Sequence, residues 1–592
     1  MDSGGTKYLK KQTLAVSVSL GVLLILAACA PAATPAPAQK PPAAPTSAPA
    51  VAAASAPANP TPRPAPVIVP PTPTPPPQIV QRGIEAERYG GSLGWAWWQP
   101  IRNYDFYENP GSTGGQVEIA YSGLLTHGDV GGATLGSDLA ESWEMSQDGL
   151  TATFKLRKNV KWHDGMPFSA EDVVYSLNQF RNPPPGVDVG FSHFLAPVAS
   201  ITAPAPDTVV FKLKHPYVGL FRALGIGPTR IMPKHILQKE KTMAKRIMGT
   251  GPFKYKSDTP GVVLRLEKFK DYFIAGRPYL DEFRVHVIPE PATAFAALQT
   301  GQVHIVAPDI ANLKLIPQIE KSANLKWYED KYPQSFRVVL QDKGPFKDFR
   351  VRRAVDLAMD RYAANAVTND GRGRLGGMVP PQSYLARPES YWQTRPGWRK
   401  DKAEDLKEAK RLMAEAGFPN GFKTTMWNRS GSYWALLGPY VQADLAGKLG
   451  ITMDVQIGSG VDWTELVNSP SPRSGDYILT PTGNTMSFDA AEQFVDNVLG
   501  VGFAGKYPLV GQKEPKFQEY VEKIRTATTQ EKQRQLVQEF EEYLLTDSKQ
   551  LWGIGLVERV RGWFYRAEVK GWGQPSGFYG MMPYRDVWLE KK

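Results

Sequence analysis

The chain of 592 residues contains only one cysteine, Cys29, and seven histidines. A single cysteine excludes an intramolecular disulfide and any metal site built from several thiolates. The histidines are scattered, and none belongs to an H-E-x-x-H or comparable ligand pattern. We therefore expect neither a metal site nor any other cofactor.

Along most of the globular part, charge of a single sign is not concentrated. The formal net charge is +11, but Lys and Arg are interleaved with Asp and Glu, which is typical of a soluble surface with a moderate basic excess. We expect no nucleic-acid partner. Hydrophobic residues make up 42% of the chain, and at this length they are sufficient for two or three packed domains.

The N-terminal apolar run is too short for a membrane-spanning helix. It extends over residues 14–28, roughly 15 residues, whereas a span needs about 20. Basic Lys7, Lys10 and Lys11 precede it and small residues end it, which is the pattern of an export signal.

The end of this run, LAAC at 26–29, resembles the lipobox of bacterial lipoproteins. The resemblance implies that residues 1–28 are a signal peptide and that the sulfur of Cys29 receives a diacylglyceryl group. A buried or incidental cysteine is the alternative. Residues 29–87 then form a disordered tether, because their Ala/Pro-rich composition cannot bury a core and favours extended polyproline II.

Residues 138–177 carry the most informative pattern in the chain. Two alternating apolar runs flank a turn at 147–149 and predict a β-hairpin. A second turn at 163–165 leads to Ser169, which we expect to cap a helix. The apolar residues of the hairpin pattern are Trp143, Met145, Phe154, Leu156 and Val160, and we expect Trp143, Phe154 and Leu156 in a core.

This stretch resembles the signature of the family 5 extracytoplasmic solute-binding proteins, the peptide, nickel and glycoside receptors of ABC importers. The resemblance implies an α/β, bilobal, periplasmic-binding-protein-like fold (cluster C type) with a third, accessory domain. The other segments that resemble landmarks of the family are GGSL at 90–93, DTVVFKLK at 207–214, GTGPF at 249–253, FKDFRVRRAVDLAMDR at 346–361 and AEAGFPNGF at 414–422.

The domain segments implied by the resemblance make lobe I discontinuous in sequence. Lobe I comprises residues 88–130, 216–335 and a C-terminal return at 561–592. The accessory domain with the signature comprises 131–215, and lobe II comprises 336–560.

The resemblance also implies a membrane-tethered extracytoplasmic receptor and not an enzyme. Such a receptor binds a peptide-like or other small organic solute between two hinged lobes and delivers it to an ABC importer permease, whose ATPase supplies the energy. We expect a monomer, anchored through its lipid to the outer face of the cytoplasmic membrane, in the periplasm or cell-wall space. A surface-tethered hydrolase and a ligand-sensing lipoprotein not coupled to transport are the alternatives.

Three patterns could indicate other functions. Residues 90–94 match the G-x-S-x-G nucleophile elbow, but the serine opens a strand instead of lying at a strand-to-helix turn. Residues 371–376 match the G-x-G-x-x-G dinucleotide fingerprint, but they follow a helix and run into two prolines, which predicts a loop. Arg350, Arg352 and Arg353 could form an anion site, although arginines on a surface helix are normally solvated or ion-paired.

Aromatic residues near expected strand ends are candidate ligand contacts, with packing in a core as the alternative. Trp97 and Trp98 lie where the first expected strand gives way to a loop, and Trp427 ends a later strand. Tyr433 and Trp434 follow in a loop before a helix. The resemblance places that loop at the ligand.

The segment 476–494 departs from the pattern of peptide-binding relatives. Those proteins have an aspartate that pairs with the ligand's amino terminus, whereas this chain has Thr-Gly-Asn-Thr at 482–485. Asn484 and Asp489 complete the candidate ligand-binding residues, although Asp489 aligns better with a later aspartate that is usually structural. The missing carboxylate and the many aromatics favour a glycoside, an opine-like or an aromatic compound over a zwitterionic peptide.

Overall fold

The computed structural model describes most of the chain from residue 86 onward. The described residues are 86–101, 103–105, 107, 116–127, 135–183, 189, 192–217, 219–307, 312–330, 334–340, 343–429, 434–458, 479–485, 491, 494–495, 514–527, 529–546, 551, 553–572 and 584–591. The predicted signal, the lipidation site Cys29 and the tether up to residue 85 lie outside these ranges. Within them, every helix is too short or too polar to cross a bilayer.

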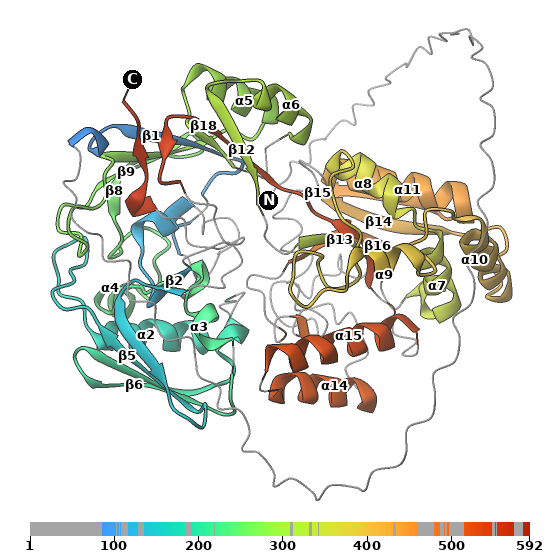
Figure 1. Ribbon diagram of the computed structural model, residues 1–592, viewed down its shortest axis with the longest axis horizontal. Helices are drawn as coiled ribbons and strands as arrows, with labels where there is room; N and C mark the ends of the chain where they lie inside the picture. The colour runs from blue at the N-terminus through green and yellow to red at the C-terminus, as the bar shows by residue number, and fades with distance from the viewer. Residues whose placement is uncertain are drawn as a thin grey trace, which may run out of the picture. The chain divides into compact units, whose positions relative to one another are not determined.

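A seven-stranded mixed sheet forms the core of what we call lobe I, in the order β12-β18-β11-β1-β10-β9-β8 (Figure 1). The central strand β1 has four consecutive buried residues, as expected of a strand covered on both faces. The strands are β1 (Ser92–Trp97), β8 (Phe253–Thr259), β9 (Val263–Lys268), β10 (Glu282–Val287), β11 (Ile305–Val306), β12 (Leu325–Glu329) and β18 (Gly562–Arg566), with helices α5 (Pro291–Thr300) and α6 (Ile316–Glu320).

A separate four-stranded antiparallel sheet, in the order β4-β5-β7-β6, contains the predicted hairpin. Its strands are β4 (Ala140–Met145), β5 (Thr151–Leu156), β6 (Val198–Ala205) and β7 (Thr208–Leu213). Both predicted turns are confirmed, since Gly149 and Gly165 adopt the positive φ angles that favour glycine. Ser169 is the N-cap of α2 (Ala170–Arg181), and its backbone N–H donates to the Asp172 carboxylate at 2.9 Å.

The core prediction for the hairpin is right for two of its three residues. Phe154 and Leu156 are buried, but Trp143 is only half-buried, because β4 is the edge strand of the sheet. Val160 is buried but lies beyond the end of β5.

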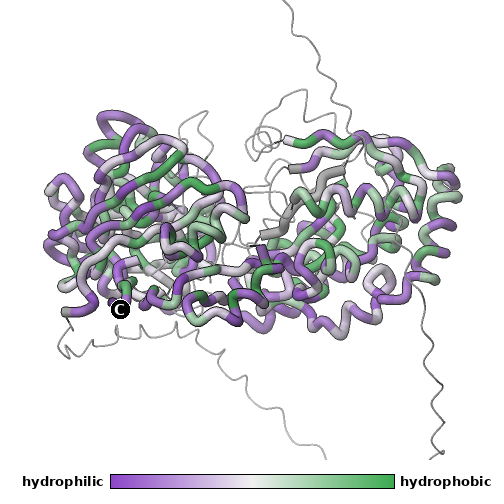
Figure 2. Tube along the Cα trace, turned by 90° about the horizontal axis from the view of Figure 1, so that it is seen from above, coloured by the Kyte–Doolittle hydropathy of each residue, from purple (hydrophilic) through white to green (hydrophobic). Residues whose placement is uncertain are grey.

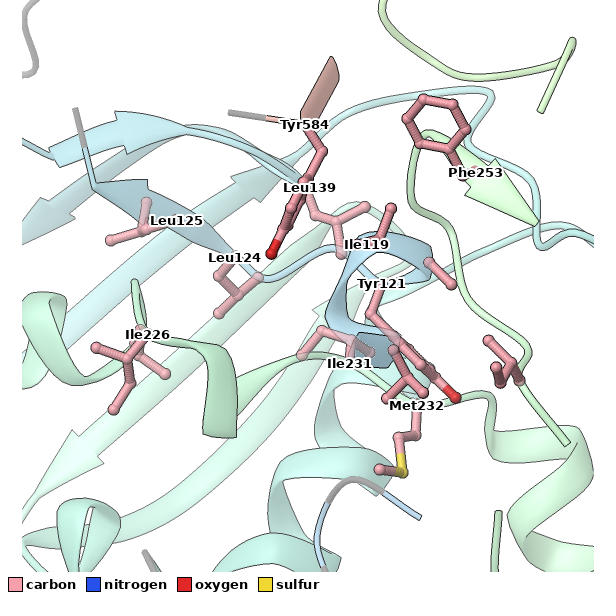
Figure 3. Packing of buried hydrophobic residues seen from close by; sticks show 14 of the residues in the cluster. Ile119, Tyr121, Leu124, Leu125, Leu139, Ile226, Ile231, Met232, Phe253 and Tyr584 are labelled. Carbon is pink, nitrogen blue, oxygen red and sulfur yellow. The ribbon is translucent and has the colours of Figure 1, made fainter. Parts of the chain in front are cut away.

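This sheet and lobe I share one continuous hydrophobic cluster. Figure 3 shows part of it, in which Leu139 lies near Leu124 and Ile119, and Phe253 and Tyr584 approach from distant parts of the chain. The short elements nearby are β2 (Leu125–His127), β3 (Leu135–Ser137), α3 (Leu220–Ala223), α4 (Lys234–Glu240), β19 (Val569–Lys570) and β20 (Trp588–Leu589).

Two of the family landmarks are hydrogen-bonded to each other through His163. Its Nε2 lies 3.0 Å from the carbonyl oxygen of Gly251, and its Nδ1 accepts the backbone N–H of Gly249 at 3.3 Å. These two bonds require a neutral ring with the proton on Nε2. Burial lowers the pKa of His163 to about 4, so the ring is neutral at physiological pH.

We expect His163 to make the protein sensitive to acid. Because its folded pKa is below the unfolded value of about 6.5, its contribution is fully present above pH 6.5 and is lost as the pH falls through about 4. The loss is at most about 3 kcal/mol, from 1.36 kcal/mol per pKa unit. Urea unfolding of wild type and His163→Gln from pH 7 to pH 4 measures it: the wild-type advantage should shrink on acidification. An advantage that does not change with pH would contradict the assignment.

Lobe II is built on a five-stranded sheet in the order β15-β14-β16-β13-β17 (Figure 1). One face of β13 packs Phe336 and Val338 into a core with α7 and α11, and Val339 on the other face packs against a core with α14 and α15. The elements are β13 (Gln334–Leu340), α7 (Phe349–Ala358), α8 (Arg361–Asn369), α9 (Glu389–Thr394), α10 (Ala403–Glu415), β14 (Lys423–Arg429), α11 (Trp434–Leu449), β15 (Thr452–Gly458), β16 (Leu479–Thr485), α14 (Pro515–Thr526), α15 (Gln530–Thr546) and β17 (Gly553–Glu558).

Along the helices, hydrophilic and hydrophobic residues alternate in short stretches (Figure 2). This is the pattern of helices that cover a sheet with one face and meet solvent with the other.

The two sheets are joined by two crossings of the chain that are hydrogen-bonded to each other. Asp330, after β12, donates its backbone N–H to the carbonyl of Arg561, before β18, at 2.8 Å. Their side chains form a buried ion pair at 3.4 Å. Arg559 donates its backbone N–H to the carbonyl of Gln334 at 3.0 Å. The entry to and the exit from lobe II are therefore fixed side by side.

The arginines of α7 do not form an anion site. Arg350 pairs with Asp348 at 2.6 Å and Arg353 pairs with Asp356 at 2.5 Å, as expected of ion-paired helix arginines. Arg352 differs from the expectation of a surface residue, since it is buried and donates to the carbonyl of Lys347 at 3.0 Å.

Candidate ligand-binding site

In lobe I, the carboxyl ends of parallel strands meet after residue 97. β1 runs parallel to both β10 and β11. Trp97 is the last residue of β1, and Trp98 follows it. Ligands of open α/β sheets bind outside the carboxyl ends of the strands, so the predicted tryptophans lie at the edge where a ligand is expected.

A layer of buried rings supports these tryptophans. The Trp97 ring packs edge-on against Trp95, with 4.8 Å between ring centroids, and Trp95 is fully buried. Trp97 and Trp98 are themselves only partly buried. The other rings within 6.4 Å of Trp95 are Phe283, Trp563, Trp572 and Tyr584.

In lobe II, β13 begins and β14, β15, β16 and β17 end at the same end of the sheet. β14 runs parallel to β16, so both end there. β13 is antiparallel to β16 and to β17, so β13 begins and β17 ends there as well. The register pairs Ser335 with both residue 484 and Glu558. The end of the lobe II sheet thus gathers residues from segments more than 200 positions apart.

The predicted lobe II residues fall at or after this end. Trp427 lies on β14, two residues before the end of the strand. It is 4% exposed and is therefore buried, not exposed as expected of a residue in a loop. Trp434 is the first residue of α11 and Asn484 lies on β16, and the structure places the backbone of both. Tyr433 and Asp489 lie outside the described residues.

The sequence interpretation missed a buried carboxylate at the same end. Glu558 is 1% exposed. It accepts hydrogen bonds from Arg374 Nε at 2.8 Å, from the Arg374 backbone N–H at 2.9 Å and from Gln382 at 2.5 Å. Residues 371–376 form a loop, as predicted, and this loop carries the Arg374 that binds Glu558.

The sequence interpretation also missed three polar residues at the start of β13. An arginine inside the otherwise apolar strand pattern QSFRVVL could have indicated a buried polar site. Gln334, Ser335 and Arg337 are buried. Both side-chain polar atoms of Gln334, the hydroxyl of Ser335 and the Nε of Arg337 lack a hydrogen-bond partner in the described part of the chain. Burial lowers the pKa of Arg337 to about 10, so its guanidinium remains charged at neutral pH.

A cavity of about 240 Å³ lies in lobe II beside Arg374. Two of its three arginines are engaged, since Arg374 is held by Glu558 and Arg387 donates to the carbonyl of Gln538 at 2.7 Å. None of the predicted ligand residues lines it. The cavity is bordered by Arg374, Leu375, Pro381, Ser383, Ala386, Arg387, Pro388, Glu389 and Arg534.

Neither a metal nor a nucleophile site is assembled in the described ranges. They contain no group of three or more His, Cys, Asp and Glu side chains placed to hold a metal ion. Ser92 opens β1 and its hydroxyl lies 3.3 Å from Arg284 Nη2, so it is not at a nucleophile elbow.

Comparison with known sequences identifies relatives over much of the chain. The family model described as bacterial extracellular solute-binding proteins, family 5 Middle, matches residues 134–505. The oligopeptide-binding protein AppA of Bacillus subtilis is 29% identical over 371 residues, which cover 59% of this chain and 65% of AppA. The glutathione-binding protein GsiB of Shigella flexneri serotype 5b is 30% identical over 293 residues, which cover 49% of this chain and 55% of GsiB. The chain thus spans less than two thirds of these relatives.

Solved structures match the fold more completely. DppA from Helicobacter pylori, in complex with the peptide STSA, is 24% identical with a TM-score of 0.74, covering 86% of this chain and 99% of DppA. AgaA from A. tumefaciens R10, in complex with agropinic acid, is 24% identical with a TM-score of 0.72, covering 85% of this chain and 99% of AgaA. These similarities confirm the predicted bilobal α/β fold class.

Proposed function

The chain belongs to the bacterial extracellular solute-binding proteins of family 5, as the sequence resemblance predicts, and we propose that it binds a small organic solute or peptide between two hinged lobes. The observation that carries the proposal is that both sheets end their parallel strands beside aromatic residues, at Trp97 and Trp98 in lobe I and at Trp427 in lobe II. A ligand that contacts both lobes stabilises the closed state, which is the usual mechanism of a hinged receptor.

We further propose that the protein delivers this solute to an ABC importer permease and stays at the membrane as a monomer through a lipid on Cys29. Such a receptor carries no catalytic group, in agreement with the place of Ser92 within a strand. The names of the relatives support binding of organic solutes in general, since they include oligopeptide, glutathione and heme.

Changing Trp97, Trp98 and Trp434 together to alanine tests the site. We expect the affinity for whichever probe binds the wild type to fall by about 100-fold, because buried aromatic anchors dominate most binding free energies. The probes are a nonapeptide, glutathione and agropinic acid, measured by titration calorimetry with the full chain. Circular dichroism checks that the variant is folded.

The matched control is Trp143→Ala, which removes a half-buried tryptophan from the edge strand β4. Its affinity should equal that of the wild type. Unchanged affinity in the triple variant would place the site elsewhere.

A further inference from the structure

Arg337 occupies an unusual position in the middle strand of lobe II. Side chains along a strand alternate between the two faces, and Phe336 and Val338 fill the core with α7 and α11. Ser335, Arg337 and Val339 therefore share the opposite face, where Val339 packs against the α14 and α15 core. Arg337 lies between that core and the polar end of the sheet, about 7 Å along the strand from Ser335.

The guanidinium of Arg337 has no counter-charge among the described residues. Its side chain makes no ion pair there, its Nε has no hydrogen-bond partner and the residue is 8% exposed. Three other buried arginines do have carboxylate partners: Arg361 with Asp356, Arg230 with Asp138 and Arg561 with Asp330. A buried charge without a partner is costly, so a group outside this set of residues has to neutralise it.

Neither Glu558 nor Glu541, two carboxylates on this side of the sheet, forms an ion pair with Arg337 in the described part of the chain. Glu558, the cross-strand neighbour of Ser335, is bound by Arg374 and Gln382. Glu541 accepts the backbone N–H groups of residues 378 and 379 at its Oε1, at 2.7 and 2.9 Å, and its Oε2 lies 3.9 Å from Arg387 Nε.

The neighbours of Arg337 across the strands leave no acidic side chain beside it. Its partner on β17 is Gly555. A Cβ built at Gly555 would lie 2.3 Å from the carbonyl oxygen of Gly377, so backbone already fills the place of a side chain there. Its partner on β16 is residue 482, a threonine.

We propose that Arg337 is a specificity-determining residue that binds a carboxylate of the solute, so that this receptor selects acids. The proposal rests on the proposed function. One guanidinium neutralises one negative charge, which matches a carboxylate, and its planar fork fits the two carboxylate oxygens. Ser335, on the same face of β13 as Arg337, offers a further unpartnered hydroxyl to the same ligand.

The test compares the acid and masked forms of each probe on the full chain. The pairs are the peptide STSA with its C-terminal amide, and agropinic acid with its methyl ester. Wild type should bind the acid of at least one pair about 100-fold more tightly than the masked form. Arg337→Met, which keeps the length but removes the charge, should bind both forms equally and weakly. Arg350→Met, at an exposed arginine, should retain the wild-type discrimination.

Melting of the ligand-free protein separates a ligand contact from an internal ion pair. If a ligand supplies the counter-charge, ligand-free Arg337→Met should melt at or above the wild-type temperature. A large drop would show that an acid of the chain itself pairs with Arg337, and would overturn the proposal, as would discrimination that persists in Arg337→Met. If the wild-type protein binds the acid and masked forms equally, the carboxylate role of Arg337 is refuted but the proposed function is not. If the wild-type protein binds no probe, both the proposed function and the role of Arg337 are refuted.

Discussion

Replacing Asp356 by alanine should lower the free energy of unfolding by about 3–5 kcal/mol, the usual cost of leaving a buried charge without its partner. Asp356 and Arg361 both have side chains with no exposed surface, and Nη2 and Oδ1 lie 2.6 Å apart. Arg361 also donates to the carbonyl of Gly555 at 2.9 Å and lies 3.7 Å from the Trp398 ring centroid. It therefore cannot move into solvent without disrupting the lobe II core.

Urea unfolding at pH 7 measures this cost, with Glu404→Ala as the matched control. Glu404 belongs to an ion pair with Lys407 at 4.0 Å in which both side chains are largely exposed, and such pairs contribute about 0–1 kcal/mol. A loss below about 1 kcal/mol in Asp356→Ala would mean that Arg361 is neutralised by another group.

Replacing Gly249 by alanine should cost about 3 kcal/mol or more, because the new methyl group has no room. A Cβ at this position would lie 1.9 Å from the carbonyl oxygen of Ala120, far inside any allowed contact. The neighbour is backbone and cannot rotate away. The shift needed would also strain the hydrogen bonds that Gly249 makes with His163.

Gly447→Ala is the control, and its expected effect on stability has the opposite sign. Gly447 lies within α11, and a Cβ there would meet no atom within 4 Å. Alanine in a helix interior is favoured over glycine by roughly 0.5–1 kcal/mol, so this variant should be slightly more stable than wild type. Thermal unfolding of both variants would reveal the difference; equal stability of Gly249→Ala and wild type would contradict the packing at Ala120.

Local patterns predicted the hairpin, its turns and the helix that follows because these features depend on neighbours in sequence. The turns at Gly149 and Gly165 and the cap at Ser169 follow from residue preferences within a few positions. Trp143 was predicted to be more buried than it is, because the alternation of apolar residues does not distinguish an edge strand from a central one.

The site was predicted less well because it is built from pairings that the sequence does not record. Ser335 and Glu558 are cross-strand neighbours although their numbers differ by 223, and the carboxylate that holds Arg374 could not be identified from the loop around it. The aromatic candidates were proposed from predicted strand ends alone. Arg337 was overlooked because its significance is the lack of a partner among the described residues, which only a structure can show.

Mass spectrometry of small molecules released from the purified full chain shows whether the protein carries an organic acid as its solute. Mild denaturation should release the same organic acid, at up to one molecule per chain, in repeated preparations from the native host. Arg337→Met prepared in parallel should release little of it. Preparations that repeatedly release no small molecule, together with no binding of any peptide, glutathione or agropinic acid probe, would contradict the account of this protein as a solute receptor.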